Sequence, residues 1–275
     1  VSAVAIAPDG TWLATGGQGD ALVRIWDQSG VLSATLASPT KWVMDVAVAP
    51  DGTWLAAASD RTVCVWDTAT WRLRSTLTGH DNAVYAVAIA PDCSWLASVS
   101  HDGTVQIWDA TTGVRRALMH EPRVVCAVTI APDGAWLATA GWDNTVRIWD
   151  TTTWQQRAIL TGHTNWGDGV AAAPDGTWLA SVGRDDTTRI WDTTTWQQRL
   201  QLTDPAATAL AIAPDGHTLA TAGHTGEIRL WDPSTGRSRA MMRVDGGVRA
   251  CVWSPTGDHL VVGGTAGLYR FNITP

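Results

Sequence analysis

The feature that most constrains the fold of this chain is a repeat of about 41 residues. One proline marks each repeat, in an Ala-Pro-Asp turn or, in the last case, in Ser-Pro-Thr: Pro8, Pro50, Pro91, Pro132, Pro174, Pro214 and Pro255. Successive prolines are 40 to 42 residues apart, so seven units account for almost the whole chain. Such a period is typical of arrays in which each repeat is one supersecondary unit that packs on its neighbours.

Each repeat is predicted to consist of short strands. In the clearest one, residues 79–109, apolar runs at 84–90, at 95–99 and up to Trp108 are separated by Pro-Asp and Asp-Gly turns. Short runs bounded by such turns predict strands, and the segment after Asp109 predicts a fourth. Every unit is therefore expected to be a four-stranded antiparallel meander.

The repeated pattern of a Gly-His start, an Ala-Pro-Asp-Gly turn (Ala-Pro-Asp-Cys in residues 90–93) and a Trp-Asp end resembles the WD-repeat β-propeller family over essentially the whole chain. The resemblance implies an all-β, seven-bladed propeller of four-stranded antiparallel blades with the first strand innermost. We expect a single domain over residues 1–275. Its blades are predicted at residues 1–38, 39–79, 80–120, 121–162, 163–203, 204–244 and 245–275.

The two ends of the chain predict an incomplete last blade. Val1 aligns with Val84, inside a first strand, and residues 267–273 align with a third strand, so the last blade lacks its outer strand within this chain. In the resembled family, residues ahead of blade one commonly supply that strand. We therefore expect an upstream segment in the natural protein and an open edge on the last blade.

Composition excludes several classes of partner. A net charge of −7 with one lysine, Lys41, argues against a nucleic-acid surface, and no apolar run approaches the roughly 20 residues of a membrane span. The four cysteines lack paired spacing, which favours buried thiols in a reducing, cytoplasmic compartment. Motifs for phosphate loops and metal ligands are missing, so no cofactor and no metal is predicted.

A Ser, His and Asp brought together could form a nucleophilic triad. The set recurs in three repeats, however, whereas catalysis requires one site. The resemblance instead implies a hydrogen-bonded chain from a loop histidine through a hydroxyl to an indole N–H, with the aspartate holding the histidine. The expected members are His80, Ser98, Asp102 and Trp108; His120, Thr139, Asp143 and Trp149; and His163, Ser181, Asp185 and Trp191.

Fourteen of the eighteen tryptophans recur at fixed positions, which packing explains. Of the other four, Trp253 aligns inside a first strand and is expected in the core. Trp42, Trp142 and Trp166 fall on loops that enter first strands or join second to third strands, at the end of a propeller called its top. Lys41 precedes Trp42 in the sequence, and the alignment places Asn165 and His224 at the same end.

Non-periodic aromatic residues beside Arg and His on loops are typical of a protein-binding hot spot. The expected partner-binding residues on the top face are Trp42, Tyr85, His101, Trp142, Trp166, Asp168, Arg184 and Arg249. The alternative is that the tryptophans fold over their own blades as local lids.

The residues aligned with Tyr85 include one acid, Asp168, and one base, Arg249, too few for an acid–base or metal mechanism. We therefore predict a non-catalytic module that binds a protein or peptide. Its near-identical, arginine-rich blades resemble WD-repeat domains of bacterial multidomain signalling proteins, such as signal-transducing ATPases or Ser/Thr kinases, in which it would be a sensor or regulatory domain. Two alternatives stay open: an enzyme site around Asp168 and Arg249, and oligomerisation through the edge of the last blade.

Overall fold

The computed structural model describes residues 1–17, 19–38 and 42–273; Lys41 lies outside them. The described residues form 27 strands and no helix. The chain divides into two compact units, Val1–Val125 and Cys126–Pro275.

The first unit contains three four-stranded sheets, blades one to three. Their strands are β1 (Ala3–Ile6), β2 (Trp12–Gly16), β3 (Leu22–Asp27) and β4 (Leu32–Ala37); β5 (Asp45–Val48), β6 (Trp54–Ser59), β7 (Thr62–Asp67) and β8 (Leu73–Thr78); and β9 (Val84–Ile89), β10 (Trp95–Ser100), β11 (Thr104–Asp109) and β12 (Arg115–His120).

The second unit contains blades four to seven, of which the last has three strands. Their strands are β13 (Val125–Ile130), which begins at the last residue of the first unit, β14 (Trp136–Gly141), β15 (Thr145–Asp150) and β16 (Gln156–Thr161); β17 (Gly167–Ala172), β18 (Trp178–Gly183), β19 (Thr187–Asp192) and β20 (Gln198–Thr203); β21 (Ala207–Ile212), β22 (Leu219–Gly223), β23 (Glu227–Trp231) and β24 (Ser238–Arg243); and β25 (Val248–Trp253), β26 (His259–Gly264) and β27 (Gly267–Asn272).

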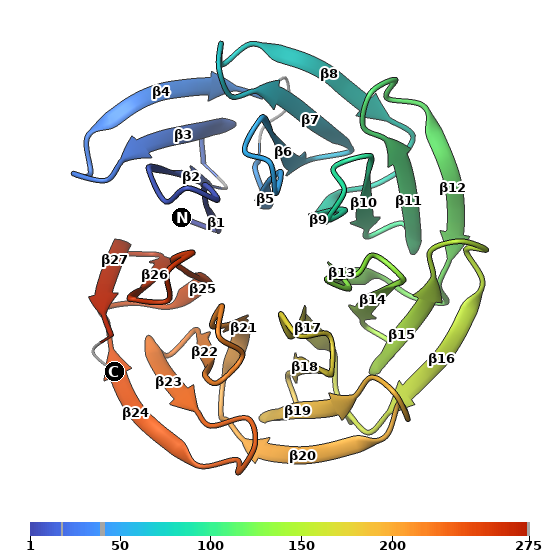
Figure 1. Cartoon of the computed structure of the whole chain (residues 1–275), viewed down its shortest axis with the longest axis vertical. Coiled ribbons are helices and arrows are strands. Elements are labelled where there is room, and N and C mark those ends of the chain that lie inside the picture. The colour runs from blue at the N-terminus through green and yellow to red at the C-terminus, as the bar shows by residue number, and fades with distance from the viewer. Residues whose placement is uncertain (18, 39–41, 274–275) are drawn as a thin grey trace. The chain divides into compact units, whose positions relative to one another are not determined.

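Every sheet is an antiparallel meander in chain order, as predicted. Within each unit the first strand of a sheet lies on the inner side and the last on the outer side (Figure 1). Neighbouring first strands contact each other: β1 contacts β5 and β5 contacts β9, while in the second unit β17 contacts β21 and β21 contacts β25. The small alanines that alternate in these strands allow this close approach. The predicted all-β, seven-bladed propeller fold, with a last blade of three strands, is confirmed.

The core lies between neighbouring sheets. The second strands β6, β10, β14 and β18 are buried along their whole length, because each is covered on both faces. One apolar cluster joins Ile25 of blade one to Leu55 and Trp66 of blade two. Trp253, too, is buried in β25. Burial is what holds each sheet beside the next, since a single meander cannot cover both of its faces.

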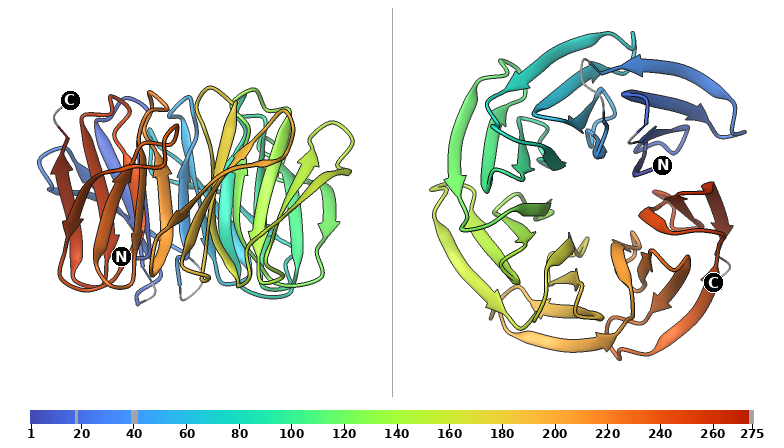
Figure 2. Two further views of the ribbon diagram at one scale, coloured as in Figure 1. Left: turned by 90° about the horizontal axis from the view of Figure 1, so that it is seen from below. Right: turned by 180° about the vertical axis from the view of Figure 1, so that it is seen from behind.

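The meander places two kinds of segment at the same end of each sheet. Because the strands alternate in direction, the loop that enters a first strand lies beside the turn that joins the second strand to the third. Figure 2 shows the connections gathered at the two ends of the sheets. We call the end with these loops the upper end, and the candidate site lies there.

In blades three, five, six and seven the first strand contains a bulge near its start. The pairing with the second strand skips one residue there: Tyr85, Asp168, Thr208 and Arg249. A bulge redirects a side chain relative to the regular alternation of a strand. Tyr85, Asp168 and Arg249 are residues that the sequence alignment placed at equivalent positions.

Candidate functional site

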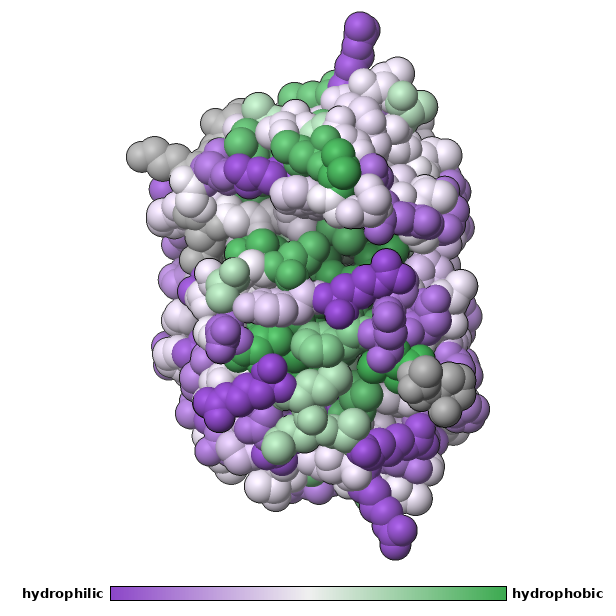
Figure 3. All heavy atoms as spheres, turned by 90° about the vertical axis from the view of Figure 1, so that its left-hand side faces the viewer, coloured by the Kyte–Doolittle hydropathy of each residue, from purple (hydrophilic) through white to green (hydrophobic). Residues whose placement is uncertain are grey.

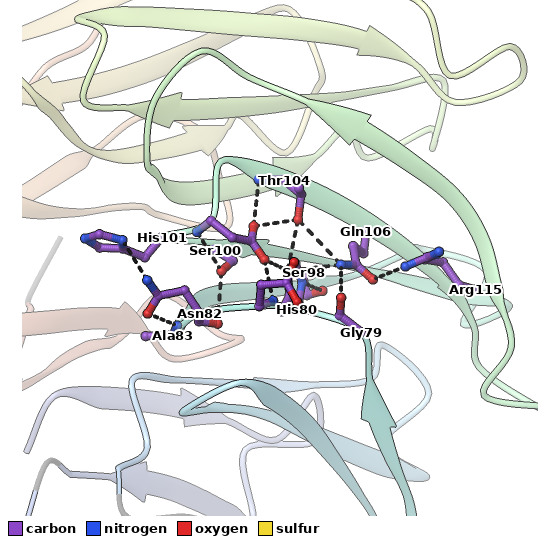
Figure 4. Close-up of polar contacts among 12 residues, drawn as sticks. Gly79, His80, Asn82, Ala83, Ser98, Ser100, His101, Thr104, Gln106 and Arg115 are labelled. Atoms are coloured by element: carbon purple, nitrogen blue, oxygen red, sulfur yellow. Dashed lines mark hydrogen bonds and ion pairs between the residues drawn. The ribbon is translucent and has the colours of Figure 1, made fainter.

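A chain of hydrogen bonds runs through the upper part of blade three (Figure 4). The indole N–H of Trp108 donates to Ser98 Oγ at 2.8 Å, and Ser98 Oγ lies 2.7 Å from His80 Nε2. An indole nitrogen can only donate, so the serine hydroxyl accepts from it and donates to the histidine. His80 then carries its proton on Nδ1, 3.1 Å from Asp102 Oδ2. The chain is satisfied when His80 is neutral.

Burial favours this neutral form. Desolvation lowers the pKa of His80 below its ordinary 6.5, with opposition from the charge of Asp102. Asp102 in turn accepts from the backbone N–H of Asp81 at 2.9 Å, so the network ties the entering loop to the turn before β11. A satisfied network of this kind fixes loop geometry and has no free nucleophile.

Blade five contains the same chain. Trp191 donates to Ser181 at 2.9 Å, and Ser181 Oγ lies 2.8 Å from His163 Nε2. His163 Nδ1 is 3.0 Å from Asp185, and Asp185 accepts from the N–H of Thr164 at 2.9 Å. Desolvation also lowers the pKa of His163.

Blade four corrects one expectation. His120 is the last residue of the outer strand β12 and is exposed, so it does not occupy the loop position of His80 and His163. Trp149 does donate to Thr139 at 3.1 Å. Asp143, however, pairs with Arg147 at 2.5 Å, so its partner is a guanidinium and not the expected imidazole of His120.

Blade six has a variant of the network that the sequence analysis missed. Trp231 donates to Thr221 at 2.8 Å, and the buried carboxylate of Asp204 accepts hydrogen bonds from Thr188, at 2.9 Å, and Thr221. Burial raises the pKa of Asp204. The signal in the sequence was the Thr203-Asp204-Pro205 segment, which replaces the Thr-Gly-His of blade five.

At the upper ends of blades four and five, four of the predicted partner-binding residues come together. The rings of Trp142 and Trp166 are stacked, with centroids 4.2 Å apart and planes at 9°. The guanidinium carbon of Arg184 lies 5.1 Å from the centroid of the Trp166 ring. Arg184 Nε donates to both carboxylate oxygens of Asp168, at 2.8 and 3.2 Å. We call these four residues the Trp–Arg stack.

Backbone contacts hold the stack in place. Asn165 Oδ1 accepts from the N–H of Trp166 at 2.9 Å, and its Nδ2 donates to the carbonyl of Arg184 at 3.2 Å. The N–H of Arg184 donates to the carbonyl of Trp166 at 2.8 Å, which links the loop that enters β17 directly to the turn that follows β18. The stack is therefore preorganised by its own loops.

A close approach between blades four and five explains why the two indoles meet. Trp142 follows Gly141 at the end of β14, and Trp166 precedes Gly167 at the start of β17. A β-carbon built on Gly167 would lie 3.2 Å from the Cβ of Ala140 and 3.5 Å from the backbone nitrogen of Gly141. Small residues at this contact therefore let the two loops come together.

The stack is partly open to solvent. Trp166 is 36% exposed, and the Arg184 side chain is 51% exposed. The Asp168 side chain is only 11% exposed, and burial raises its pKa while the bond to Arg184 opposes that shift. Both oxygens of this carboxylate accept from Arg184, so the pair with the guanidinium holds Asp168 in place.

The other predicted partner-binding residues lie outside the stack. Tyr85 and His101 form a tilted ring pair with centroids 6.0 Å apart in the first unit. Trp42, also in the first unit, is 49% exposed, and its carbonyl accepts from Ser59 Oγ at 2.6 Å. Arg249 is exposed on β25 in the second unit.

Among residues 1–17, 19–38 and 42–273, no group of three or more His, Cys, Asp or Glu side chains is arranged to hold a metal ion. The same part of the chain has no helix that is long and apolar enough to cross a membrane.

Comparison with known proteins gives one family. The family described as WD domain, G-beta repeat matches residues 1–27, 30–67, 71–109, 115–150, 154–192 and 197–232. These segments contain the Trp-Asp ends of blades one to six and stop before the last blade. None of the curated proteins matches the chain. Because the matched segments make up most of the sequence, this chain belongs to the WD-repeat family.

Proposed function

We propose that the chain binds a protein or peptide at the upper end of its second unit, through the Trp–Arg stack. WD-repeat propellers are typically interaction modules and generally non-catalytic scaffolds. The observation that carries the proposal is the preorganised stack of Trp142, Trp166 and Arg184, in which Trp166 and Arg184 are exposed and Trp142 is half-buried. Trp and Arg are the residue types enriched at binding hot spots.

The physical argument rests on rigidity. An aromatic side chain that is already held in place loses little conformational entropy when a partner covers it. Asn165 fixes the backbone of Trp166, and Asp168 fixes Arg184. The lid alternative requires each indole to cover its own blade, whereas Trp142 of blade four and Trp166 of blade five stack on each other.

The test begins with peptides selected from a displayed library on the wild-type chain. Their affinity is then measured by calorimetry for the double variant Trp142→Ala/Trp166→Ala. We expect a loss of at least about 100-fold, which corresponds to a hot spot of about 3 kcal/mol. The melting temperature should fall by only a few degrees, because both residues lie at the surface.

Leu73→Ala provides the matched control. Leu73 is 48% exposed on the outer strand β8, so its truncation also removes exposed apolar surface without touching the stack. The control should bind as the wild type does. Selected peptides that bind the double variant and the wild type equally well would refute the proposal.

The proposal extends to the setting of the chain. Eighteen arginines against one lysine, and repeated segments such as Ala-Pro-Asp-Gly-Thr-Trp, support a regulatory or sensor domain of a bacterial signalling protein in the cytoplasm. In that setting an upstream domain of the same natural protein is one partner. Copurification of the chain with a separately expressed upstream segment, lost in the double variant, is the expected result.

A second candidate is self-association through the last blade. Blade seven has three strands, and Leu268 on its last strand β27 is 38% exposed. Figure 3 shows hydrophobic side chains at the surface on the side of the molecule where β27 lies in Figure 1. An edge strand of this kind can pair with another chain. Sedimentation at increasing concentration should then show a dimer, which Leu268→Lys abolishes.

A further inference from the structure

Part of Arg184 remains available for a partner. Its Nε is used by Asp168, at 2.8 Å from Oδ2. Its two terminal amino groups have no hydrogen-bond partner among the residues that the structure describes. A guanidinium offers five N–H donors in a fixed planar arrangement, so a held and half-exposed Arg184 presents up to four of them.

The surroundings of these donors favour a negative ligand. His224 is exposed, and its charge in the protonated form lowers the pKa of the Asp168 carboxyl. The carboxylate of Asp168 is already paired with Arg184 Nε. A cationic ligand would meet the Arg184 charge, whereas an acidic ligand would meet its unused donors.

We propose that the Trp–Arg stack recognises an acidic peptide. A Glu or Asp side chain of the peptide accepts hydrogen bonds from the terminal amino groups of Arg184, and an adjacent aromatic side chain packs on the exposed part of Trp166. This inference rests on the proposed function and adds the chemical class of the partner. A planar carboxylate matches the guanidinium, and hydrogen bonds between charged groups are stronger than those to a neutral acceptor.

The test uses four blocked hexapeptides of sequence Ala-Ala-Xaa-Phe-Ala-Ala, where Xaa is Glu, Gln, Lys or phosphoserine. Binding is followed by the NMR signals of the Trp142 and Trp166 indole N–H groups, which also report weak affinities. We expect the Glu peptide to bind about tenfold more tightly than the Gln peptide. The Lys peptide should leave both signals unchanged.

Variants connect this preference to Arg184. Arg184→Gln should make the affinities of the Glu and Gln peptides equal. Arg184→Lys should restore little of the preference for the Glu peptide, because lysine lacks the planar set of donors. Arg61→Gln, which replaces an exposed arginine in the turn between β6 and β7, should bind as the wild type does. High salt should weaken the Glu peptide more than the Gln peptide.

The outcomes separate this inference from the proposed function. Equal binding of the Glu and Gln peptides to the wild type would refute the acidic preference, and so would unchanged indole signals with all four peptides. Tighter binding of the phosphoserine peptide by more than about tenfold would replace the carboxylate by a phosphate as the ligand. The proposed function fails separately, when library-selected peptides bind the double tryptophan variant as well as the wild type.

Discussion

The upper ends of blades three and five have the same internal network and different surface side chains. In both, a neutral histidine accepts from a serine that accepts from an indole. In both, an asparagine at the same position, Asn82 or Asn165, accepts from the next backbone N–H. The surface positions differ: blade three carries Ala83, Tyr85 and His101 where blade five carries Trp166, Asp168 and Arg184.

This difference separates structure from recognition. The buried network fixes the conformation of the loops in both blades. The side chains on these loops differ, with a tilted Tyr85–His101 ring pair on blade three and the Asp168–Arg184 ion pair on blade five. Surface residues on this frame can therefore change without changing the fold. We therefore expect the residues that bind a partner to be those that differ between equivalent positions.

The largest expected effect comes from the shared network. Ser98→Ala and Ser181→Ala each leave a buried indole N–H and a buried histidine nitrogen without a partner. We expect each variant to lose about 2–3 kcal/mol of unfolding free energy, measured by urea denaturation. Because the two networks have the same geometry, the two losses should agree within about 1 kcal/mol. A much larger loss in one blade would show that the two networks are not equivalent.

Acid should weaken both networks. The folded-state pKa of His80 and His163 lies below the ordinary 6.5, so protonation favours the unfolded chain. The contribution of the two neutral histidines to the unfolding free energy is complete above about pH 6.5 and is lost as the pH falls below that value. NMR titration of the two rings should give pKa values below 6.5, and a value above 6.5 for either ring would contradict the neutral network.

Asp45 requires a separate control, because its contribution has the opposite sign. Its carboxylate on β5 accepts from the N–H of Val87 at 3.0 Å, and burial raises its pKa to about 6. Ionisation therefore destabilises the folded chain as the pH rises from about 4 to 6. The unfolding free energy, measured as a function of pH, should therefore fall more steeply below pH 6.5 in the Asp45→Asn variant than in the wild type.

The turns before the outer strands supply a smaller effect. Blade three has Gly113 at φ 69°, whereas blade five has Trp196 at φ 56°, a conformation that costs a non-glycine residue on the order of 1 kcal/mol. Trp196 offsets that cost by packing edge-on against Trp136, with centroids 5.5 Å apart. In Trp196→Gly the two effects oppose each other, so we expect a net loss of less than about 2 kcal/mol. A gain in stability would show that the edge-on contact contributes little.

Much of this architecture follows from local patterns in the sequence. Turn residues such as Gly52 at φ 73° recur with the period of the proline, so the sheets and their meander order could be predicted. The Trp142–Trp166 contact could not, because it depends on how closely β14 and β17 approach, which Gly167 permits. The loop position predicted for His120 was wrong, because the sequence shows only that a histidine lies near a loop. Its pairing with Thr104 places His120 in β12 instead.

The smallest expected effect on stability is also the sharpest test of the comparison. The double variant Tyr85→Asp/His101→Arg transfers the ion pair of blade five to blade three, where Asn82 already holds the loop as Asn165 does. Exposed ion pairs contribute little, so unfolding free energy should change by less than about 1 kcal/mol.

If the frame is shared, the introduced guanidinium should pair with the introduced carboxylate, which a slowly exchanging arginine Nε–H signal would report. Loss of folding, or a freely exchanging guanidinium, would mean that the loops of blade three differ in more than their surface residues. Binding of the acidic peptide should not appear at blade three, because Ala83 provides no indole for the aromatic side chain to cover.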